Sequence, residues 1–365
     1  MLTTKEGKKH IGMLTDIGFG HDWANASELV ARTTRIDIRK GKVGAGGHNL
    51  AHIQIRPSRY LGRANLALEG RQLAKLLMKV ADSHERVDIL HGHFFDRSEG
   101  LSRAADRLQV PFVLTEHKTA VTGVGTTSSR FGQSELKRAR RMYEHSSAVI
   151  AVSTYLKSVI DEFADCSCFV VGNPIDIDLF HPGPEVPFSR HERPIKLICV
   201  GRLVPSKGLD FLLHGFKKIT EVLDAELSII GQGREHDRLR NLTMELGLND
   251  QVTFHGRLAR PSIAELARGS DLGVSTSVIE TFGLSAAEFS STGLPVVAPD
   301  RPPFDEVLPP SGRILYEEGS LESFKDAVEQ ACNTSWDPVA IRTHIAERFA
   351  LPIIAEKLHR IYQEL

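Results

Sequence analysis

Short runs of apolar, often β-branched residues alternate with longer amphipathic segments along most of this chain. Such runs predict strands, and the segments between them, where apolar residues recur three or four positions apart, predict helices. Regular alternation of the two is typical of a parallel sheet covered by helices on both faces, the α/β class. In the first half we expect strands at 10–14, 36–39, 52–55, 87–90, 112–115, 148–152 and 169–171, and helices at 64–81, 100–108 and 134–146.

The alternation stops near 172–174 and resumes after a proline-rich stretch at 181–194. Proline-rich connectors are typical of domain boundaries, and a chain of 365 residues is too long for one comfortable core. In the second half we expect strands at 196–200, 227–230, 252–255, 272–274 and 295–298. The pattern therefore predicts a first domain at 1–178, a linker at 179–194, a second domain at 195–348 and a terminal helix at 349–365.

Composition narrows the classes of function. The chain holds 45 Lys and Arg against 46 Asp and Glu, so bulk positive charge does not favour a nucleic-acid partner. No apolar run has the length of a membrane helix, and no signal-peptide core follows the first residues, which predicts a cytoplasmic protein. The four cysteines fit a reducing compartment and lack zinc-binding spacing.

A stretch in the second half carries the most specific candidate chemistry. Glu280 follows an expected strand, and Glu288 lies eight positions later in an expected short helix. On a continuous helix this spacing is about 12 Å of rise with a net rotation of about 80°, so we expect the two carboxylates to share a face. The first free N–H groups of the helix, from Phe282 to Ser285, predict an anion site between them. Acid, anion site and acid in this order fit a sugar, a diphosphate and a ribose.

Glycine turns follow two other expected strands of the same half. Gly201, Arg202 and Lys207 follow the first of these strands, and Gly231 and Gly233 follow the second. Open α/β sheets bind ligands at the carboxyl ends of their strands. Glycine lets backbone approach a phosphate, and the two cations match a diphosphate. These turns therefore belong to the same predicted site as the two carboxylates.

Three other features favour structural roles. The glycine-rich stretch at 41–48 lacks the terminal Lys-Ser or Lys-Thr of a phosphate loop, and we interpret it as a connection. Asp176 and Asp178 resemble a metal-binding Asp-x-Asp pair, but their place after a proline favours a turn, and we expect no metal. The basic helix at 134–142 is interpreted first as a solvated face, and second as a contact with an acidic membrane surface or a phosphorylated acceptor.

The ordered motifs of the second half resemble the retaining, GT-B-fold glycosyltransferases of family 4. The shared motifs are Gly-Arg-Leu and Lys-Gly within 201–208, Gly-Gln-Gly at 231–233, Phe-His-Gly at 254–256, Glu-Thr-Phe-Gly-Leu at 280–284, Ala-Glu at 287–288 and Gly-Leu-Pro-Val-Val at 293–297. In the first half, 87–93, 111–117 and 171–174 also match. The resemblance implies a GT-B architecture, in which two doubly wound Rossmann-like domains face each other across a crevice and the terminal helix crosses back to the first.

The resemblance also implies roles for individual residues. Glu280 is expected to hold hydroxyls of a donor sugar, Glu288 to hold a ribose, and His117 to project over the sugar from the first domain. Arg202 and Lys207 are expected to neutralise the diphosphate. The catalytic candidates are His117, Arg202, Lys207 and Glu280, and the donor-binding candidates are Gly201, Gly231, Gly233, Arg257, Phe282, Gly283, Leu284 and Glu288.

Two stretches depart from the family pattern. No proline-rich Gly-Gly loop is recognisable around 15–25, after the first strand, where contacts to an acceptor are expected. Pro302 and Pro303 stand where a glycine pair is common after the strand at 295–298. The first departure concerns the acceptor side of the site, and the donor side keeps its motifs.

We therefore expect transfer of a glycosyl group from a nucleotide diphosphate sugar, with a uridine diphosphate sugar as first choice, to a hydroxyl of a glycan, lipid-linked or small-molecule acceptor. A front-face reaction with retained configuration and no metal or other cofactor is expected, because fixed cations and a helix N-terminus stabilise the leaving diphosphate. The alternatives are a nucleotide-sugar epimerase or a phosphorylase of the same fold, and a non-catalytic donor-binding partner subunit. The basic helix adds a peripheral contact with the inner face of an acidic membrane to the expected partners.

Overall fold

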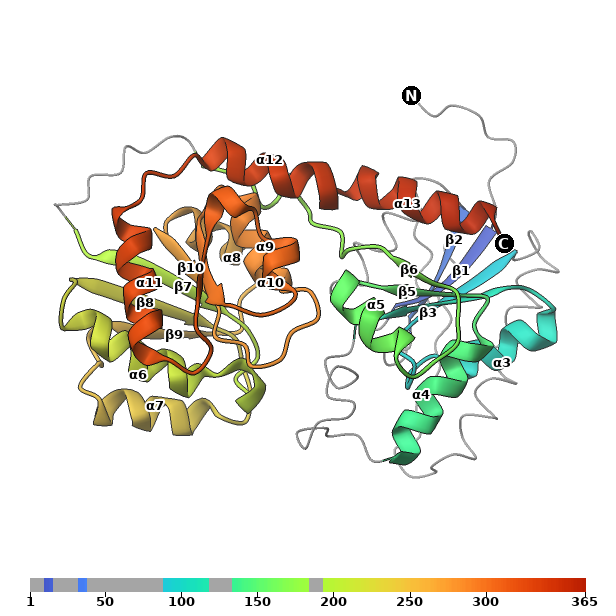
Figure 1. The fold of residues 1–365 in the computed structure, drawn as a ribbon, viewed down its shortest axis with the longest axis horizontal. Helices are drawn as coiled ribbons and strands as arrows, with labels where there is room; N and C mark the ends of the chain where they lie inside the picture. The colour runs from blue at the N-terminus through green and yellow to red at the C-terminus, as the bar shows by residue number, and fades with distance from the viewer. Residues whose placement is uncertain (1–9, 16–31, 38–87, 118–132, 184–192) are drawn as a thin grey trace. The chain divides into compact units, whose positions relative to one another are not determined.

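The computed structural model describes residues 10–15, 32–37, 88–117, 133–183 and 193–365, with backbone alone for the first two segments. The chain divides into two compact units (Figure 1). Unit 1 comprises Met1–Pro174 and Leu351–Leu365, and unit 2 comprises Ile175–Ala350. The expected strand at 52–55, the expected helix at 64–81, the glycine-rich stretch at 41–48 and most of the departing loop at 15–25 lie outside the described residues.

Unit 1 is built on a parallel sheet with the strand order β2-β1-β3-β4-β5-β6. The strands are β1 (His10–Thr15), β2 (Arg32–Asp37), β3 (Ile89–His93), β4 (Phe112–Glu116), β5 (Ala148–Ala151) and β6 (Cys168–Val170). The helices that the structure describes in this unit are α3 (Glu99–Leu108), α4 (Gln133–His145), α5 (Thr154–Asp161) and α13 (Leu351–Gln363). The predicted parallel α/β class is therefore confirmed for this half.

The central strands of unit 1 are buried along their whole length. Every residue of β3, β4 and β5 is buried, which is expected of parallel strands covered on both faces. The sequence places the strand of β3 at 87–90, whereas the structure continues it through His93. The difference arises because His91 and His93 are polar by type yet lie inside the sheet, where periodicity alone does not place histidines.

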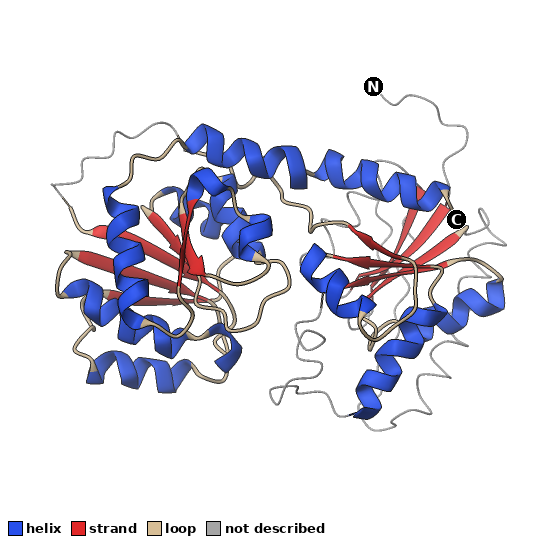
Figure 2. Cartoon of the chain, in the orientation of Figure 1, coloured by secondary structure: helices blue, strands red, loops and turns tan. Residues whose placement is uncertain are grey.

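Unit 2 is built on a second parallel sheet, with the order β12-β11-β10-β7-β8-β9 (Figure 2). Its strands are β7 (Ile195–Val200), β8 (Ala225–Ile230), β9 (Val252–Gly256), β10 (Leu272–Val274), β11 (Val296–Pro299) and β12 (Arg313–Tyr316). Its longer helices are α6 (Leu209–Thr220), α7 (His236–Glu245), α8 (Arg260–Arg268), α9 (Leu284–Ser291), α11 (Leu321–Asn333) and α12 (Pro338–Phe349). Short helical turns are η2 (Pro205–Lys207), α10 (Phe304–Val307) and η3 (Pro310–Gly312).

Helices cover both faces of the sheet in unit 2. Leu197 and Ile198 are consecutive in β7, and they belong to two different hydrophobic clusters, because successive strand residues point to opposite faces. The first cluster contains residues of α6, α7 and α11, and the second contains residues of α8, α9 and α10. Together with the buried parallel strands of unit 1, this arrangement confirms the α/β fold with a parallel sheet that the sequence predicts for each half.

The segment after Pro174 packs on unit 2. Ile175 pairs with Ala350, the Ser291 hydroxyl donates to the carbonyl oxygen of Phe180 at 2.6 Å, and Arg342 donates to the same oxygen at 3.0 Å. Because of these contacts the division of the chain comes at Pro174, whereas the sequence places the end of the first domain at 178. Asp176 uses a carboxylate oxygen to accept from the backbone N–H of Leu179 at 3.0 Å, so it supports a turn.

The end of the chain forms two helices separated by one residue. Helix α12 remains in unit 2, and Ala350 takes an extended conformation with φ −58° and ψ 149° before α13 begins. Helix α13 belongs to unit 1, where Ile354, Leu358 and Tyr362 are buried. The sequence expects a single helix over 349–365, and the structure instead ends α12 at Phe349.

Candidate active site

Glycine turns bring the carboxyl ends of β7 and β8 into direct backbone contact. Gly231 has φ 143°, and a Cβ atom there would lie 1.8 Å from the carbonyl oxygen of Gly201. A Cβ atom at Gly233 would lie 2.1 Å from the carbonyl oxygen of Leu203. Larger residues therefore do not fit at these two positions. The close approach seen here is between the two turns themselves, and the predicted approach of their backbone to a phosphate stays a prediction.

Lys207 and Glu280 form the central ion pair of unit 2. The Lys207 Nζ donates to Glu280 Oε2 at 2.6 Å, with side chains 23% and 13% exposed. The loops that carry them are tied together, because Thr276 Oγ1 donates to the Lys207 carbonyl oxygen at 3.0 Å and the Val278 N–H donates to that of Ser206 at 3.0 Å. Two residues far apart in the sequence are thus held side by side in the loops that follow the central strands β7 and β10.

The charge of Glu280 is maintained against its burial. Burial alone favours the neutral acid, but the positive charge and hydrogen bond of Lys207 outweigh it and hold the pKa of Glu280 below its ordinary value. The backbone N–H groups of Thr281 and Gly283 act in the same direction, with the Thr281 N–H donating to Oε1 at 3.1 Å. Glu280 is therefore an ionised acceptor at neutral pH, fixed by donors from two loops.

Glu280 and Glu288 do not share a continuous helix, contrary to the expectation from their spacing. Helix α9 begins at Leu284, after Gly283, whose φ of 81° is left-handed. Glu280 therefore precedes the helix, and the rise and rotation of an uninterrupted helix do not relate the two carboxylates. Each is held by its own cation. The N-terminal turn of α9 nevertheless lies between them in the chain, as the predicted anion site requires.

Glu288 pairs with Arg260, a residue that the sequence does not single out. Arg260 Nη2 donates to Glu288 Oε1 at 3.1 Å, and the same guanidinium lies 5.3 Å from the centre of the Phe180 ring. Arg260 is the first residue of α8, whereas Glu288 lies in α9. The sequence singles out the nearby Arg257 as a donor-binding residue, for its place after the Phe-His-Gly motif, and it gives no signal for Arg260.

The other predicted residues occupy two kinds of position. Arg202 and Arg257 are exposed, and neither makes a side-chain hydrogen bond or ion pair that the structure records among residues 193–365. Phe282 is buried and packs edge-on against Phe349, with ring centres 5.1 Å apart. Phe282 can therefore offer a ligand only its backbone, and Gly283 supplies the turn that starts α9.

In unit 1 the predicted His117 lies among other histidines at the carboxyl ends of β3 and β4. His93 Nδ1 and His117 Nε2 are 2.9 Å apart, and the rings stack with centres separated by 5.2 Å. Burial lowers the pKa of both rings, that of His93 to about 3, and the charge of His93 lowers that of His117 further. Both imidazoles are therefore neutral at neutral pH.

Glu116 holds the backbone around His117. Its Oε1 accepts from the His117 N–H at 2.9 Å, and its Oε2 accepts from the Phe95 N–H at 3.1 Å and the Tyr143 hydroxyl at 2.8 Å. The carboxylate thus ties β4 to the loop after β3 and to α4. This network fixes the direction in which the His117 side chain leaves the strand.

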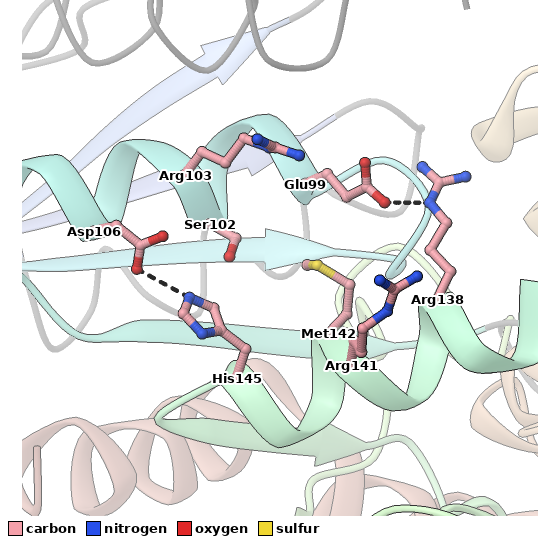
Figure 3. A pocket seen from close by; sticks show the side chains of 8 residues that line it. All are labelled: Glu99, Ser102, Arg103, Asp106, Arg138, Arg141, Met142 and His145. Carbon is pink, nitrogen blue, oxygen red and sulfur yellow. Dashed lines mark hydrogen bonds and ion pairs between the residues drawn. The ribbon is translucent and has the colours of Figure 1, made fainter. Parts of the chain in front are cut away.

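A polar groove of about 380 Å³ lies between α3 and α4 on unit 1 (Figure 3). Arg138 of α4 pairs with Glu99 of α3, and His145 Nε2 is 2.9 Å from Asp106 Oδ1. Arg103 and Arg141 also line the groove and form no recorded ion pair with a described residue. The groove therefore presents positive charge beyond what its own acids neutralise.

Neither a metal cluster nor a membrane-crossing helix is found in the described part of the chain. No group of three or more His, Cys, Asp or Glu side chains within those segments is arranged to hold a metal ion. Among the same residues, no helix combines the length and the apolar character needed to cross a bilayer. Among the predicted residues, the structure brings Lys207 to Glu280 and Gly231 to Gly201, while His117 lies against His93, which is not among the predicted site residues.

Comparison with known proteins identifies both halves of the chain. The sequence model for the family described as Glycosyl transferases group 1 matches residues 186–347, and that for Glycosyltransferase Family 4 matches residues 26–179. An uncharacterised glycosyltransferase of Methanocaldococcus jannaschii is 27% identical over 229 residues, 58% of this chain and 57% of that protein. A D-inositol 3-phosphate glycosyltransferase of Geodermatophilus obscurus is 28% identical over 299 residues, 75% of this chain and 66% of that protein. The matches thus span between half and two thirds of these two relatives.

Solved structures share the fold. Sucrose-phosphate synthase from Thermosynechococcus elongatus has a TM-score of 0.79 at 16% identity, covering 98% of this chain and 99% of the other. The Anabaena protein HepE, solved in complex with UDP-glucose, has a TM-score of 0.76 at 19% identity, covering 98% of this chain and 100% of the other. At such identities the likeness concerns the fold, which is the GT-B architecture that the motifs predict.

Proposed function

Because the chain belongs to the GT-B glycosyltransferases of family 4, we propose that it transfers a glycosyl group from a nucleotide diphosphate sugar to a hydroxyl, with retention of the anomeric configuration. The observation that carries the proposal is the Lys207–Glu280 pair, set on tied loops beside the glycine turns of β7 and β8. It places a fixed cation and a fixed acceptor where open α/β sheets bind their ligands. The HepE complexes with UDP and UDP-glucose support a uridine diphosphate sugar as the first donor to test.

The donor would be held by carboxylates that accept hydrogen bonds and by backbone N–H groups that donate them. Glu280, ionised through its contact with Lys207, accepts hydrogen bonds from sugar hydroxyls. Glu288 accepts from the two ribose hydroxyls, in a position set by Arg260. The backbone N–H groups at the start of α9 point toward the diphosphate, since the first N–H groups of a helix have no partner within it.

The reaction requires stabilisation of the charge that develops on the leaving diphosphate. Lys207 and Arg202 supply fixed positive charge, and the N-terminus of α9 adds a partial positive charge, so the proposal needs no metal ion or other cofactor. Arg202 is exposed and able to reorient toward a phosphate, whereas Lys207 is preset by Glu280. In a front-face reaction a diphosphate oxygen takes the proton of the attacking hydroxyl, and the hydroxyl oxygen attacks the sugar from the same side.

In the proposal, unit 1 contributes His117 to the donor sugar and contains the acceptor-binding loops. His117 is a neutral ring held at the carboxyl end of β4, and we assign it a hydrogen bond to an oxygen of the donor sugar. A glycan, lipid-linked or small-molecule acceptor would supply the attacking hydroxyl. The proposal places the protein in the cytoplasm, where nucleotide sugars would reach it.

The α3–α4 groove supports a peripheral contact with an acidic membrane. Arg103 and Arg141 provide the charge for lipid phosphates, and each basic residue near such a surface contributes about 1 kcal/mol. Co-sedimentation with vesicles of phosphatidylglycerol and phosphatidylcholine tests this contact. Binding should fall in the Arg103→Glu/Arg141→Glu variant and remain in Arg238→Glu of unit 2. Equal binding by both variants would remove the membrane from the proposal.

A transfer assay tests the reaction itself. The purified chain is incubated with UDP-[¹³C]glucose and other labelled nucleotide sugars, first alone and then with a panel of sugar, polyol and glycolipid acceptors. The proposal predicts an acceptor-dependent product whose anomeric signal matches that of the donor. A changed sugar in the absence of acceptor would indicate an epimerase, and binding without any product in either condition would indicate a donor-binding subunit.

A further inference from the structure

Three histidine rings form a stacked column inside unit 1. His91 and His93 are two positions apart in β3, and both side chains therefore leave the same face of the sheet. His91 stacks on His93 with ring centres 4.9 Å apart and planes inclined by 17°. His93 stacks on His117 at 5.2 Å and 24°. All three residues are buried, and we call this group the histidine column.

Hydrogen bonds connect the column to a helix at the other end of the chain. The pair of His93 Nδ1 and His117 Nε2 lies at one end of the column. At the other end, His91 Nε2 is 2.6 Å from Thr115 Oγ1, and His91 Nδ1 is 2.6 Å from the hydroxyl oxygen of Tyr362. Tyr362 lies in α13 and is buried. The C-terminal helix is thus bonded to the column that ends at His117.

The column is electrically neutral at neutral pH. Burial lowers the pKa of each ring, and the pKa values of His91 and His117 fall further through the charges of neighbouring rings. Glu116, the carboxylate next to His117 in the chain, accepts from the backbone N–H of His117 and from the Tyr143 hydroxyl, and burial raises the pKa of Tyr143. Asn173 hydrogen-bonds to the His117 side chain and acts in the opposite direction, raising the pKa of His117.

Neutral rings that share a hydrogen bond have linked tautomers. One of the two facing nitrogens must carry the proton and the other must accept it. Since Nε2 of His117 faces His93, Nδ1 is the ring nitrogen of His117 that can face a donor sugar. A hydrogen bond from this nitrogen to a sugar oxygen, the role assigned to His117 in the proposed function, requires the proton on Nδ1, and the donor in the shared bond is then Nδ1 of His93.

We propose that His93 is a positioning residue that donates its Nδ1–H to Nε2 of His117 and so fixes the proton of His117 on Nδ1, while Tyr362 anchors the column through His91. The ring of His117 then offers a hydrogen-bond donor to an oxygen and does not serve as a general base. This inference rests on the role of His117 in the proposed function. It adds His93 and Tyr362, which contact neither substrate in that proposal, as residues that act through His117.

Nitrogen-15 spectra of the full-length chain labelled at histidine test the tautomer without any need for activity. His117 is assigned by its absence in His117→Asn, and the spectra are followed from about pH 5.5 to 8, the range in which an exposed histidine titrates. We expect one His117 species, neutral and protonated on Nδ1, across this range. A His117 ring that is protonated on Nε2, or that titrates near its ordinary pKa, overturns the proposal.

Two substitutions of His93 separate positioning from packing. In His93→Asn the amide nitrogen replaces Nδ1 as a donor, whereas His93→Leu fills the space without one. We expect His117 to keep its single tautomer in His93→Asn and to become mixed in His93→Leu. In the transfer assay we expect kcat to fall about tenfold in His93→Leu, with donor KM changed less and with recovery in His93→Asn. Equal behaviour of the two variants would mean that His93 only fills space.

Tyr362→Phe tests the connection to α13. Removal of the hydroxyl should shift the ¹⁵N signals of His91 and, more weakly, those of His93 and His117. The matched control is Tyr155→Phe in α5, a half-buried position of the same unit outside the column. Column signals that are unchanged in Tyr362→Phe would remove α13 from the proposal. If no nucleotide sugar supports transfer but the tautomer result holds, the proposed function fails and the positioning inference stands.

Discussion

At the scale of residues, the two carboxylates of the candidate site in unit 2 each form an ion pair. Glu280 is held by Lys207 and Glu288 by Arg260, and in each pair the partners come from different loops or helices. Such pairs preset the carboxylates before a ligand binds, which reduces the ordering that binding would otherwise require. The pairs also make each carboxylate depend on a cation that no local sequence pattern associates with it.

Coupling between Lys207 and Glu280 should be measurable as folding stability. A double-mutant cycle with Lys207→Met and Glu280→Gln is expected to give an interaction free energy of about 1–3 kcal/mol in urea unfolding, because both side chains are largely buried. The exposed pair of Lys157 and Asp161 provides the control, with about 0.5 kcal/mol or less. An interaction at the central pair no larger than in the control would contradict its role as a preset unit.

Arg260 should influence nucleotide binding through Glu288. Calorimetric titration with UDP is expected to show about tenfold weaker binding to Arg260→Met, because the loss of one charged hydrogen bond releases the carboxylate. Arg238→Met in α7 serves as the control. For Glu288→Gln, the loss should be smaller with 2′-deoxy-UDP than with UDP. If both nucleotides lose affinity equally, Glu288 does not bind the ribose.

Some residues of the candidate site can be predicted from the sequence, and others cannot. Lys207, Glu280 and the glycine turns are found from motif and spacing, because each lies in a loop that follows a strand. Arg260 is missed because its pairing with Glu288 joins two helices, and Tyr362 is missed because 271 positions separate it from His91. The prediction that Glu280 and Glu288 share one helix is wrong because the helix begins at Leu284, four residues after Glu280.

At the scale of elements, hydrophobic periodicity locates most of the described strands. The exceptions have physical reasons. β12 follows the proline-rich stretch at 302–310 and carries too few apolar residues to stand out, with only Ile314, Leu315 and Tyr316 after Arg313. β3 is extended by buried histidines. The break between α12 and α13 at Ala350 is a change of backbone conformation inside a continuous amphipathic pattern.

Helix α13 should contribute strongly to the stability of unit 1. Leu358 is completely buried, and Leu358→Ala is expected to lower the free energy of unfolding by about 2–5 kcal/mol. Val339→Ala in α12, where the side chain is 70% exposed, should change it by less than about 0.5 kcal/mol. Denaturant unfolding with both variants gives the comparison. A loss at Leu358 as small as that at Val339 would mean that α13 does not pack on unit 1.

For the whole molecule, the two units should differ in their response to acid. Among the residues that the structure describes, three buried histidines of unit 1 have lowered pKa values, against one partly buried histidine, His344, in unit 2. Below about pH 6.5 the histidines bind protons in the unfolded chain but stay neutral in the folded chain. The folded state therefore keeps its full stability above that pH and loses stability as the pH falls toward about 3, the pKa of His93.

Calorimetric unfolding between about pH 7.5 and 5 should therefore lower the transition of unit 1 more than that of unit 2. Each histidine contributes up to about 1.4 kcal/mol per pH unit. Glu280, whose pKa is also lowered, affects unit 2 only below its ordinary range near 4.5. His93→Leu should reduce the slope for unit 1. A pH response that is equal in both units would contradict the neutral, buried state of the column.

The central claim is that unit 2 binds a nucleotide diphosphate sugar through Lys207 and Glu280. The most direct measurement is thermal unfolding with a panel of nucleotide sugars, carried out on the wild-type chain and on Lys207→Met. At least one nucleotide sugar should stabilise the wild type by about 2.7 kcal/mol at a hundredfold excess over its dissociation constant, and the same ligand should stabilise Lys207→Met far less. If no nucleotide sugar stabilises the wild type, or if the same one stabilises both chains equally, the claim is contradicted.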